Sequence, residues 1–319
     1  MKRILILCFI VLGWLHSAFG QVTFNIDGFS EQYYGKVYFS DTTQTASAGW
    51  VEVYDRATKK KLIHVDADEL SFDLYDNPQK AYITKIPYEE QSAILYKDFN
   101  FDGVKDFAII DGFRNWTLGH SFKIFLASSK RFVFSDSFTE LTQDNQGMFT
   151  VNAINKTIST KSKIGDTWYQ YSDYIVENNK PKLIRRHTDD YEHAPFYRET
   201  IEELKGNKMV KTTRSSLALE RYHIEECFKF HVDKVNKDII LCNFYDDRLY
   251  YVILDAKQNV EFYYPFEELR QTSDFIFYRK NGKLTFKNKD ASYTIYDKSG
   301  KIGVDITYKG KTHQWKGNA

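Results

Sequence analysis

Short alternating segments broken by polar turns run through most of this chain, and this pattern constrains the fold more than any other feature. "FIFYRKNGKLTF" contains Asn281-Gly282, a two-residue hairpin signal because both residues accept a positive φ. "GWVEVYDRATKKKLIHV" and "YYVILDAKQNVEFYY" alternate on both sides of a turn in the same way. Aromatic residues make up 17% of the chain, which favours strands over helices. The sequence therefore predicts an all-β fold of antiparallel hairpins, arranged as a sandwich, a barrel or a propeller.

The first residues, "MKRILILCFIVLGWLHSAFGQ", have the order of a secretory signal peptide. A basic start precedes a short apolar run, and Ala18 and Gly20 are the small residues expected before cleavage at Gln21. The apolar run is too short for a membrane span, and no later stretch is long and apolar enough to be one. We therefore expect a signal peptide at residues 1–20 and a protein that is periplasmic or secreted.

The rest of the chain is predicted to form two parts. We expect a β domain at 21–205 and a C-terminal β-hairpin module at 206–319, with the boundary near Lys205-Gly206-Asn207. Without the signal peptide, 42 Lys and Arg residues face 43 Asp and Glu residues. A net charge this close to zero gives no indication of a nucleic-acid or anionic-membrane partner.

The segment "KDFNFDGVKDFAIIDG", residues 97–112, concentrates acidic residues between two apolar runs. Alternation lets the side-chain oxygens of the first three polar residues converge in a tight loop, and a glycine follows them. The predicted ligands of a cation are Asp98, Asn100, Asp102, the backbone carbonyl of Val104, and Asp106. Oxygen ligands of this kind are what Ca²⁺ prefers. An EF-hand would need Glu at Ile109, so this is a different calcium loop; a solvated acidic turn is the alternative.

This loop resembles the calcium loop of integrin-type FG-GAP propeller blades. Over residues 50–190, "LYKDFNFDGVKDFAIIDG", "SFKIFLASSKRFVFSDSFTEL", "GMFTVNAINKTIST" and "YSDYIVENNKPKLIRR" resemble a family of exported bacterial proteins with one such loop. The resemblance implies a β-propeller-like arrangement, followed here by a C-terminal β extension. Many members have cysteines where this chain has Asn115, Gln146 and Asp166, so its domain must hold together without those bridges.

Some members of that family are periplasmic immunity proteins that behave as lysozyme inhibitors. The resemblance therefore implies a partner that is another protein, such as a peptidoglycan hydrolase. "FRNWTLGH" follows the loop's exit strand, and we predict a partner-binding surface next to the loop at Arg114, Trp116 and His120. Arg and Trp are favoured at binding hot spots. The alternative is that Trp116 packs under the loop. A cell-surface adhesion or structural module of the FG-GAP type is the competing function.

The sequence contains no recognisable catalytic motif, so we do not predict an enzyme. It lacks a nucleophile elbow, a phosphate-binding glycine loop and an H-E-x-x-H zinc motif. "RRHTDDYEHAP" collects His187, Asp189, Asp190, Glu192 and His193, which a zinc hydrolase would use. Because no paired metal spacing is present, we interpret this segment as a charged surface loop ending at Pro195.

Two cysteines remain after signal cleavage, Cys227 and Cys242. An even pair in an oxidising compartment indicates a disulfide. Their midpoint lies between Lys234 and Val235, so a hairpin turning there would place the two cysteines opposite each other. Two separate buried thiols are the alternative.

Overall fold

The computed structural model describes residues 22–41, 44, 46–71, 85–87, 92–129, 131–222, 227–244, 248–266 and 275–318. The predicted signal peptide lies outside these residues. The chain divides into two compact units, Met1–Thr160 with Val176–Pro181, and Lys161–Ile175 with Lys182–Ala319. This division differs from the predicted boundary at 205–206. Lys205 pairs with Lys208, so Gly206 and Asn207 are the turn of one hairpin.

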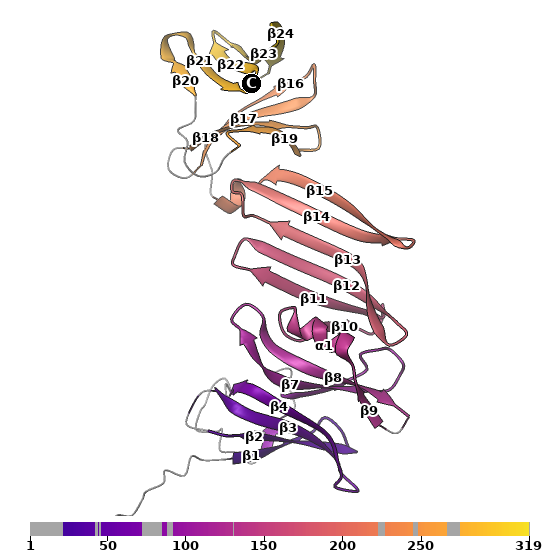
Figure 1. Ribbon diagram of the computed structural model, residues 1–319. Coiled ribbons are helices and arrows are strands. Elements are labelled where there is room, and N and C mark those ends of the chain that lie inside the picture. Colours follow the sequence, from indigo (N-terminus) through magenta and orange to yellow (C-terminus); the bar gives the residue numbers. More distant parts are fainter. Residues whose placement is uncertain are drawn as a thin grey trace, which may run out of the picture. The chain divides into compact units, whose positions relative to one another are not determined.

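Antiparallel strands build nearly all of the described structure, which confirms the predicted all-β fold of hairpins (Figure 1). Among the described residues, two sheets have four strands in chain order, as propeller blades do, and the other three have five or six. One parallel pair, β1 with β5, interrupts this pattern in the first sheet. In the described part of the chain no helix is long and apolar enough to cross a membrane.

The first unit contains two sheets and the α-helix. The five-stranded sheet has the order β4-β3-β2-β1-β5 and comprises β1 Val22–Asp27, β2 Tyr33–Phe39, β3 Ala46–Asp55, β4 Lys61–Ser71 and β5 Lys85–Pro87. The four-stranded sheet comprises β6 Ile94–Lys97, β7 Asp106–Asn115, β8 Gly119–Ser128 and β9 Arg131–Phe134, in chain order. Helix α1 is Asp136–Gln143.

Aromatic side chains join these two sheets. The Tyr33 ring lies edge-on to those of Tyr96, Phe107 and Phe132, at centroid distances of 5.7, 5.5 and 5.6 Å. Helix α1 is bonded to β8, where the Thr139 hydroxyl accepts the backbone N–H of Ile124 at 3.0 Å. The core therefore fixes β7 and β8, the strands on which Asp106, Arg114 and His120 lie.

A six-stranded sheet follows, with its strands in chain order. It comprises β10 Thr150–Asn152, β11 Thr157–Ile164, β12 Trp168–Glu177, β13 Lys180–Asp190, β14 Phe196–Lys205 and β15 Lys208–Leu217. Successive residues of a strand point to opposite faces. In β13, β14 and β15 residues of both faces stay at least partly exposed, and Phe196 is the buried one. Cross-strand ion pairs such as Arg186 with Glu202, 3.2 Å apart, replace an apolar core here.

The C-terminal part of the second unit has two sheets, each in chain order. One comprises β16 Cys227–Val232, β17 Lys237–Phe244, β18 Arg248–Leu254 and β19 Val260–Tyr264; the other comprises β20 Ile276–Tyr278, β21 Lys283–Asn288, β22 Ala291–Lys298, β23 Lys301–Tyr308 and β24 Lys311–Gly317. Short 3-10 helices lie at Glu220–Tyr222 and Arg279–Asn281. A shared core that includes Tyr251 and Phe286 packs the two sheets together.

Candidate functional site

The predicted calcium loop connects β6 to β7, as expected. Within it, side-chain oxygens accept backbone N–H groups of the same loop. Asp98 Oδ2 accepts the Gly103 N–H at 2.9 Å, and Asp102 Oδ1 accepts the Val104 N–H at 2.8 Å. Gly103 has a φ of +89°, which an L side chain rarely adopts, so the glycine allows the bend that these bonds require.

Asp106 is the most deeply placed acid of the loop, with no exposed surface. Its Oδ2 accepts the Phe99 N–H at 2.8 Å, and its Oδ1 accepts the Ala127 N–H at 2.8 Å. Burial raises the pKa of Asp106 to about 6, and the charges of Asp102 and Asp98 add to the rise, while the two backbone N–H bonds oppose it. Asp106 therefore ties the loop to β8 and has few compensating charges around it.

Asn179, which was not among the predicted site residues, also contacts this loop. It lies in the turn between β12 and β13, within the same compact unit as the loop. Its Oδ1 accepts a hydrogen bond from the buried Asn100 Nδ2 at 3.0 Å. Asn178 and Asn179 both have positive φ, at 52° and 58°. The "ENNK" turn signal was readable in the sequence, but its contact with a loop 79 residues away was not.

The donor atoms of this loop fit a calcium ion, because they are carboxylate and amide oxygens. In the structure these oxygens do not surround a single point. Among the described residues, only one group of three His, Cys, Asp or Glu side chains brings its ligand atoms within 4.8 Å, and that group is elsewhere. The loop acids bind backbone N–H groups instead. Calcium binding at Asp98, Asn100, Asp102, Val104 and Asp106 thus stays a prediction.

The predicted partner surface is the tip of the β7–β8 hairpin. Trp116 is 96% exposed, and its ring meets the edge of the Phe113 ring at a centroid distance of 5.4 Å. Trp116 therefore does not pack under the loop. Arg114 is also exposed. His120 is only partly exposed, and burial lowers its pKa.

The surface does not lie next to the calcium loop, and that part of the prediction is wrong. The loop ends where β7 begins at Asp106, and the hairpin tip follows where β7 ends at Asn115. At about 3.3 Å per residue, the two ends of this strand are roughly 30 Å apart. The two features are close together in the sequence because one strand joins them. They are far apart in space because the backbone of that strand is extended.

Hydrogen bonds made by the side chains of Asn115 and Gln146 hold the hairpin tip. Asn115 Oδ1 accepts the N–H groups of Thr117 and Leu118, each at 2.8 Å. Gln146 Nε2 donates to the Thr117 carbonyl at 2.8 Å. The Gly147 N–H donates to the Leu118 carbonyl at 2.8 Å. These bonds fix the turn that presents Trp116.

Cys227 and Cys242 are register partners across the β16–β17 hairpin, as the spacing predicted. Both are free thiols in the structure, so the predicted disulfide is not formed there. Burial raises the pKa of the Cys242 thiol to about 12. The cross-strand position that a disulfide needs is present, and the bond itself stays a prediction.

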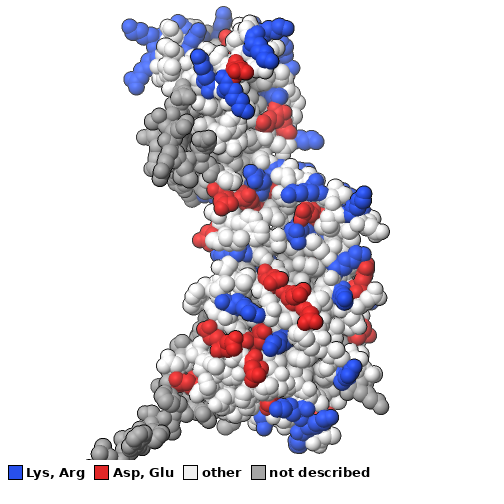
Figure 2. Space-filling model, viewed as in Figure 1, with Lys and Arg blue, Asp and Glu red and all other residues white. Residues whose placement is uncertain are grey.

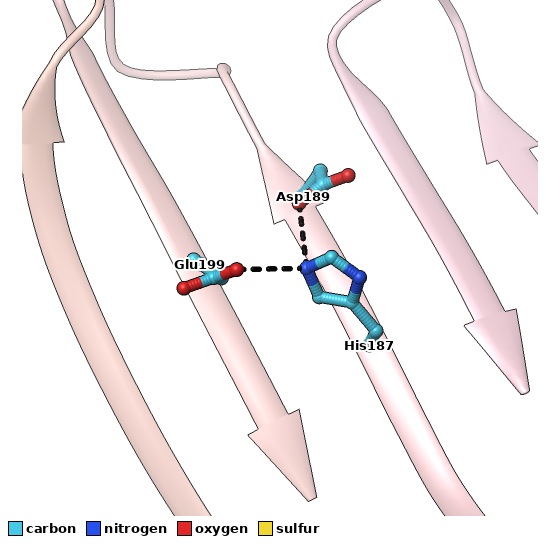
Figure 3. Close-up of side chains that lie close together, drawn as sticks. All are labelled: His187, Asp189 and Glu199. Atoms are coloured by element: carbon cyan, nitrogen blue, oxygen red, sulfur yellow. Dashed lines mark hydrogen bonds and ion pairs between the residues drawn. The ribbon is translucent and has the colours of Figure 1, made fainter.

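The "RRHTDD" segment is not a loop, because β13 continues through Asp190 and the turn begins only after it. This strand places His187 and Asp189 on one face, and β14 adds Glu199 beside them (Figure 3). The His187 Nε2 atom is 3.0 Å from Asp189 Oδ1 and 3.1 Å from Glu199 Oε1. The sequence motif contains His187 and Asp189, whereas Glu199 lies ten residues further along the chain than Asp189 and was not predicted.

Lysine and arginine side chains gather over the C-terminal sheet (Figure 2). Residues 276–319 contain ten Lys and Arg residues and three Asp residues. The near-zero net charge of the whole chain therefore hides a strongly basic region.

No protein-family model and no curated protein matches this chain. Among solved structures, a type IV secretion system related protein from Xanthomonas is 20% identical to this chain, with a TM-score of 0.43. The match covers 61% of this chain and 94% of the Xanthomonas chain. TolB from Acinetobacter baumannii has 8% identity and a TM-score of 0.22, with coverages of 92% and 65%. The WD40 domain of Toxoplasma gondii coronin has 8% identity and a TM-score of 0.21, with coverages of 92% and 69%. Identities and TM-scores this low support no conclusion about function.

Proposed function

We propose that this chain is an exported, calcium-binding protein that binds another protein, and that the partner is a peptidoglycan hydrolase which it inhibits. The observation that carries the proposal is Trp116, an aromatic side chain that is 96% exposed at the tip of a fixed hairpin. A large apolar side chain held in solvent is unfavourable in isolation, and Trp is among the residues most enriched at binding hot spots.

The hairpin is preorganised for binding. Asn115, Gln146 and Gly147 hold its turn by hydrogen bonds, so little backbone entropy is lost when a partner docks. Arg114 is exposed two residues before the tryptophan in the chain and adds a charged group that can pair with a carboxylate of the partner. The pattern of an aromatic anchor with a neighbouring arginine suits a protein partner with an acidic, concave site.

Calcium has an indirect role in this proposal. The loop at residues 98–106 lies at the start of β7, and the hairpin tip lies at its end. A cation bound by Asp98, Asn100, Asp102, the Val104 carbonyl and Asp106 would stabilise the beginning of that strand without contacting the partner. The resemblance to immunity proteins supports the choice of a wall-cleaving enzyme as the partner.

The test adds the purified protein to a panel of lysozymes and related peptidoglycan hydrolases and measures wall lysis. We expect one or more enzymes to be slowed, and Trp116→Ala or Arg114→Ala to weaken binding by roughly 2 kcal/mol or more. Tyr308→Ala, which removes an aromatic side chain 47% exposed in the other unit, is the matched control and should bind normally.

Absence of inhibition across the panel, together with no hydrolase captured from periplasmic and secreted fractions, would contradict the proposal and favour the adhesion module. Lysis by the protein alone would overturn the assignment as a non-enzyme.

A further inference from the structure

His187, Asp189 and Glu199 form a cluster, called here the strand-face cluster, that no part of the proposed function uses (Figure 3). One atom of each side chain lies within 4.8 Å of the other two. Among the residues that the structure describes, no other three His, Cys, Asp or Glu side chains bring one ligand atom each to within 4.8 Å of the other two. We infer that the strand-face cluster binds a divalent cation of the zinc type.

The positions of the three side chains follow from strand geometry. His187 and Asp189 are two residues apart on β13, so their side chains share a face. Asp189 pairs directly with Glu199 in the antiparallel register of β13 and β14. Because the ladder fixes all three Cα positions, a cation would find the ligands already assembled.

The three side chains need only a small adjustment to bind a metal ion. Zinc bonds to histidine nitrogen and carboxylate oxygen are about 2.0–2.2 Å long and zinc sites are tetrahedral, so neighbouring ligands are about 3.4 Å apart. The His187 Nε2 atom is 3.0 Å from the Asp189 oxygen and 3.1 Å from the Glu199 oxygen. A single N–H group can point at only one of these oxygens, whereas a cation in place of that proton can bind all three atoms.

A tyrosine outside the cluster holds one ligand in place. The Tyr197 hydroxyl donates to Asp189 Oδ1 at 2.6 Å, and burial followed by this bond raises the pKa of Tyr197. The Tyr197 ring stacks on that of Tyr191 at 4.7 Å, and the Arg221 guanidinium lies 3.9 Å from the Tyr191 centroid. Metal ligands are commonly oriented by such outer hydrogen bonds.

The ligand set selects the kind of cation. One imidazole nitrogen with two carboxylate oxygens suits zinc and its first-row neighbours, while calcium takes six to eight oxygens. All three side chains are partly exposed, which leaves a coordination position open to water. Binding uses the lone pair of His187 Nε2, so the ring proton lies on Nδ1 in the metal-bound form and no net proton is lost from a neutral ring.

The location gives the cation a structural role. Strands β13, β14 and β15 keep both faces partly exposed and bury little apolar surface. A cation shared by β13 and β14 would join two strands that otherwise depend on their ladder and on exposed ion pairs, which contribute little.

Calorimetric titration of the full mature chain with Zn²⁺ tests the inference, and Co²⁺ absorption reports the ligand type. We expect one zinc per chain, lost in His187→Ala and weakened at least tenfold in Glu199→Gln. Tyr197→Phe should weaken binding about 10- to 100-fold, because it removes an outer hydrogen bond. Glu202→Gln is the matched control, since it removes an equal charge from the opposite face of β14 and should bind zinc as the natural chain does.

Circular dichroism confirms that each variant is folded. Equal zinc binding by the natural chain, His187→Ala and Glu199→Gln would overturn the inference and leave an ordinary ion-paired histidine. Thiolate bands in the Co²⁺ spectrum, with binding lost in Cys227→Ser and kept in Glu199→Gln, would assign the metal to the cysteine pair and overturn it as well.

Discussion

The loop at residues 98–106 and the strand-face cluster of His187, Asp189 and Glu199 both crowd acidic groups, but they are assembled in different ways. In the loop, all the acids come from nine consecutive residues and accept backbone N–H groups, as Asp98 does from Gly103. In the cluster, two strands contribute the side chains, and these meet a histidine. The comparison teaches that consecutive spacing is readable from a sequence, whereas a site made by strand register is not.

The two regions also differ in what their acids do for the fold. Asp106 is fully buried and holds backbone N–H groups on either side of β7, so the local structure depends on it. Glu199 is partly exposed and bonds only to one side chain among its described contacts. We therefore expect substitutions in the loop to cost stability and substitutions in the cluster to cost metal binding.

The largest expected effect is that of Asp106→Ala on stability. The substitution leaves the N–H groups of Phe99 and Ala127 buried without an acceptor, at about 1–3 kcal/mol each. We expect the free energy of unfolding to fall by about 3 kcal/mol, measured by urea denaturation in the presence of a chelator. Asp106→Asn keeps one acceptor oxygen and should lose less. Equal stability of the natural chain and Asp106→Ala would show that the loop does not depend on this carboxylate.

Calcium should give the next largest effect, because it binds the folded loop and not the unfolded chain. At 100 times the Kd the gain is about 2.7 kcal/mol, and with a Kd on the order of 10⁻⁴ M this requires about 10 mM calcium. Asp102→Ala should abolish the rise in Tm, while Glu199→Gln should leave it unchanged. Identical melting curves in calcium and in chelator would argue against the loop as a calcium site.

Gly103→Ala should have a smaller effect, of about 1 kcal/mol, because an L side chain is strained at a φ of +89°. No atom lies within 4 Å of the added Cβ, so strain is the only cost. Gly206→Ala is the matched control, with a φ of +62° and the same open surroundings in the β14–β15 turn. Thermal melts should show a similar loss for both, and only Gly103→Ala should also weaken calcium binding. If Gly103→Ala leaves the calcium affinity unchanged, calcium binding does not depend on the bend at Gly103.

Glu199→Gln without added metal should give the smallest effect, a stability change within about 0.5 kcal/mol, since Asp189 still accepts from His187 and both faces of the sheet are partly exposed. Urea denaturation in chelator measures this change. A loss above about 1.5 kcal/mol would mean that the cluster stabilises the fold without a cation, and the contrast between the two regions would disappear.

The sequence predicted mainly those features that depend on residues close together in the chain. Asn281 and Gly282 lie in a hairpin turn, but the connection has four residues, 279–282, and only Gly282 takes a positive φ, so the predicted two-residue turn is wrong. Cys227 faces Cys242 because the turn between them is centred where the spacing placed it. The loop before Asp106 joins two strands, as its flanking apolar runs predicted. The exposed position of Trp116 was left open, because a tryptophan after a strand fits both a buried and a solvent position.

The sequence by itself determined the all-β class, the turns, and the contiguous acids of the loop, because these depend on propensities and spacings within a few residues. Only the tertiary structure decided that Asn179 reaches Asn100, that Gln146 holds the turn carrying Trp116, and that Glu199 joins His187. Each of these contacts joins different turns or strands. These contacts form only when the strand register and the packing are correct. Register and packing depend on the burial and hydrogen bonding of whole sheets, so a short stretch of sequence cannot predict them.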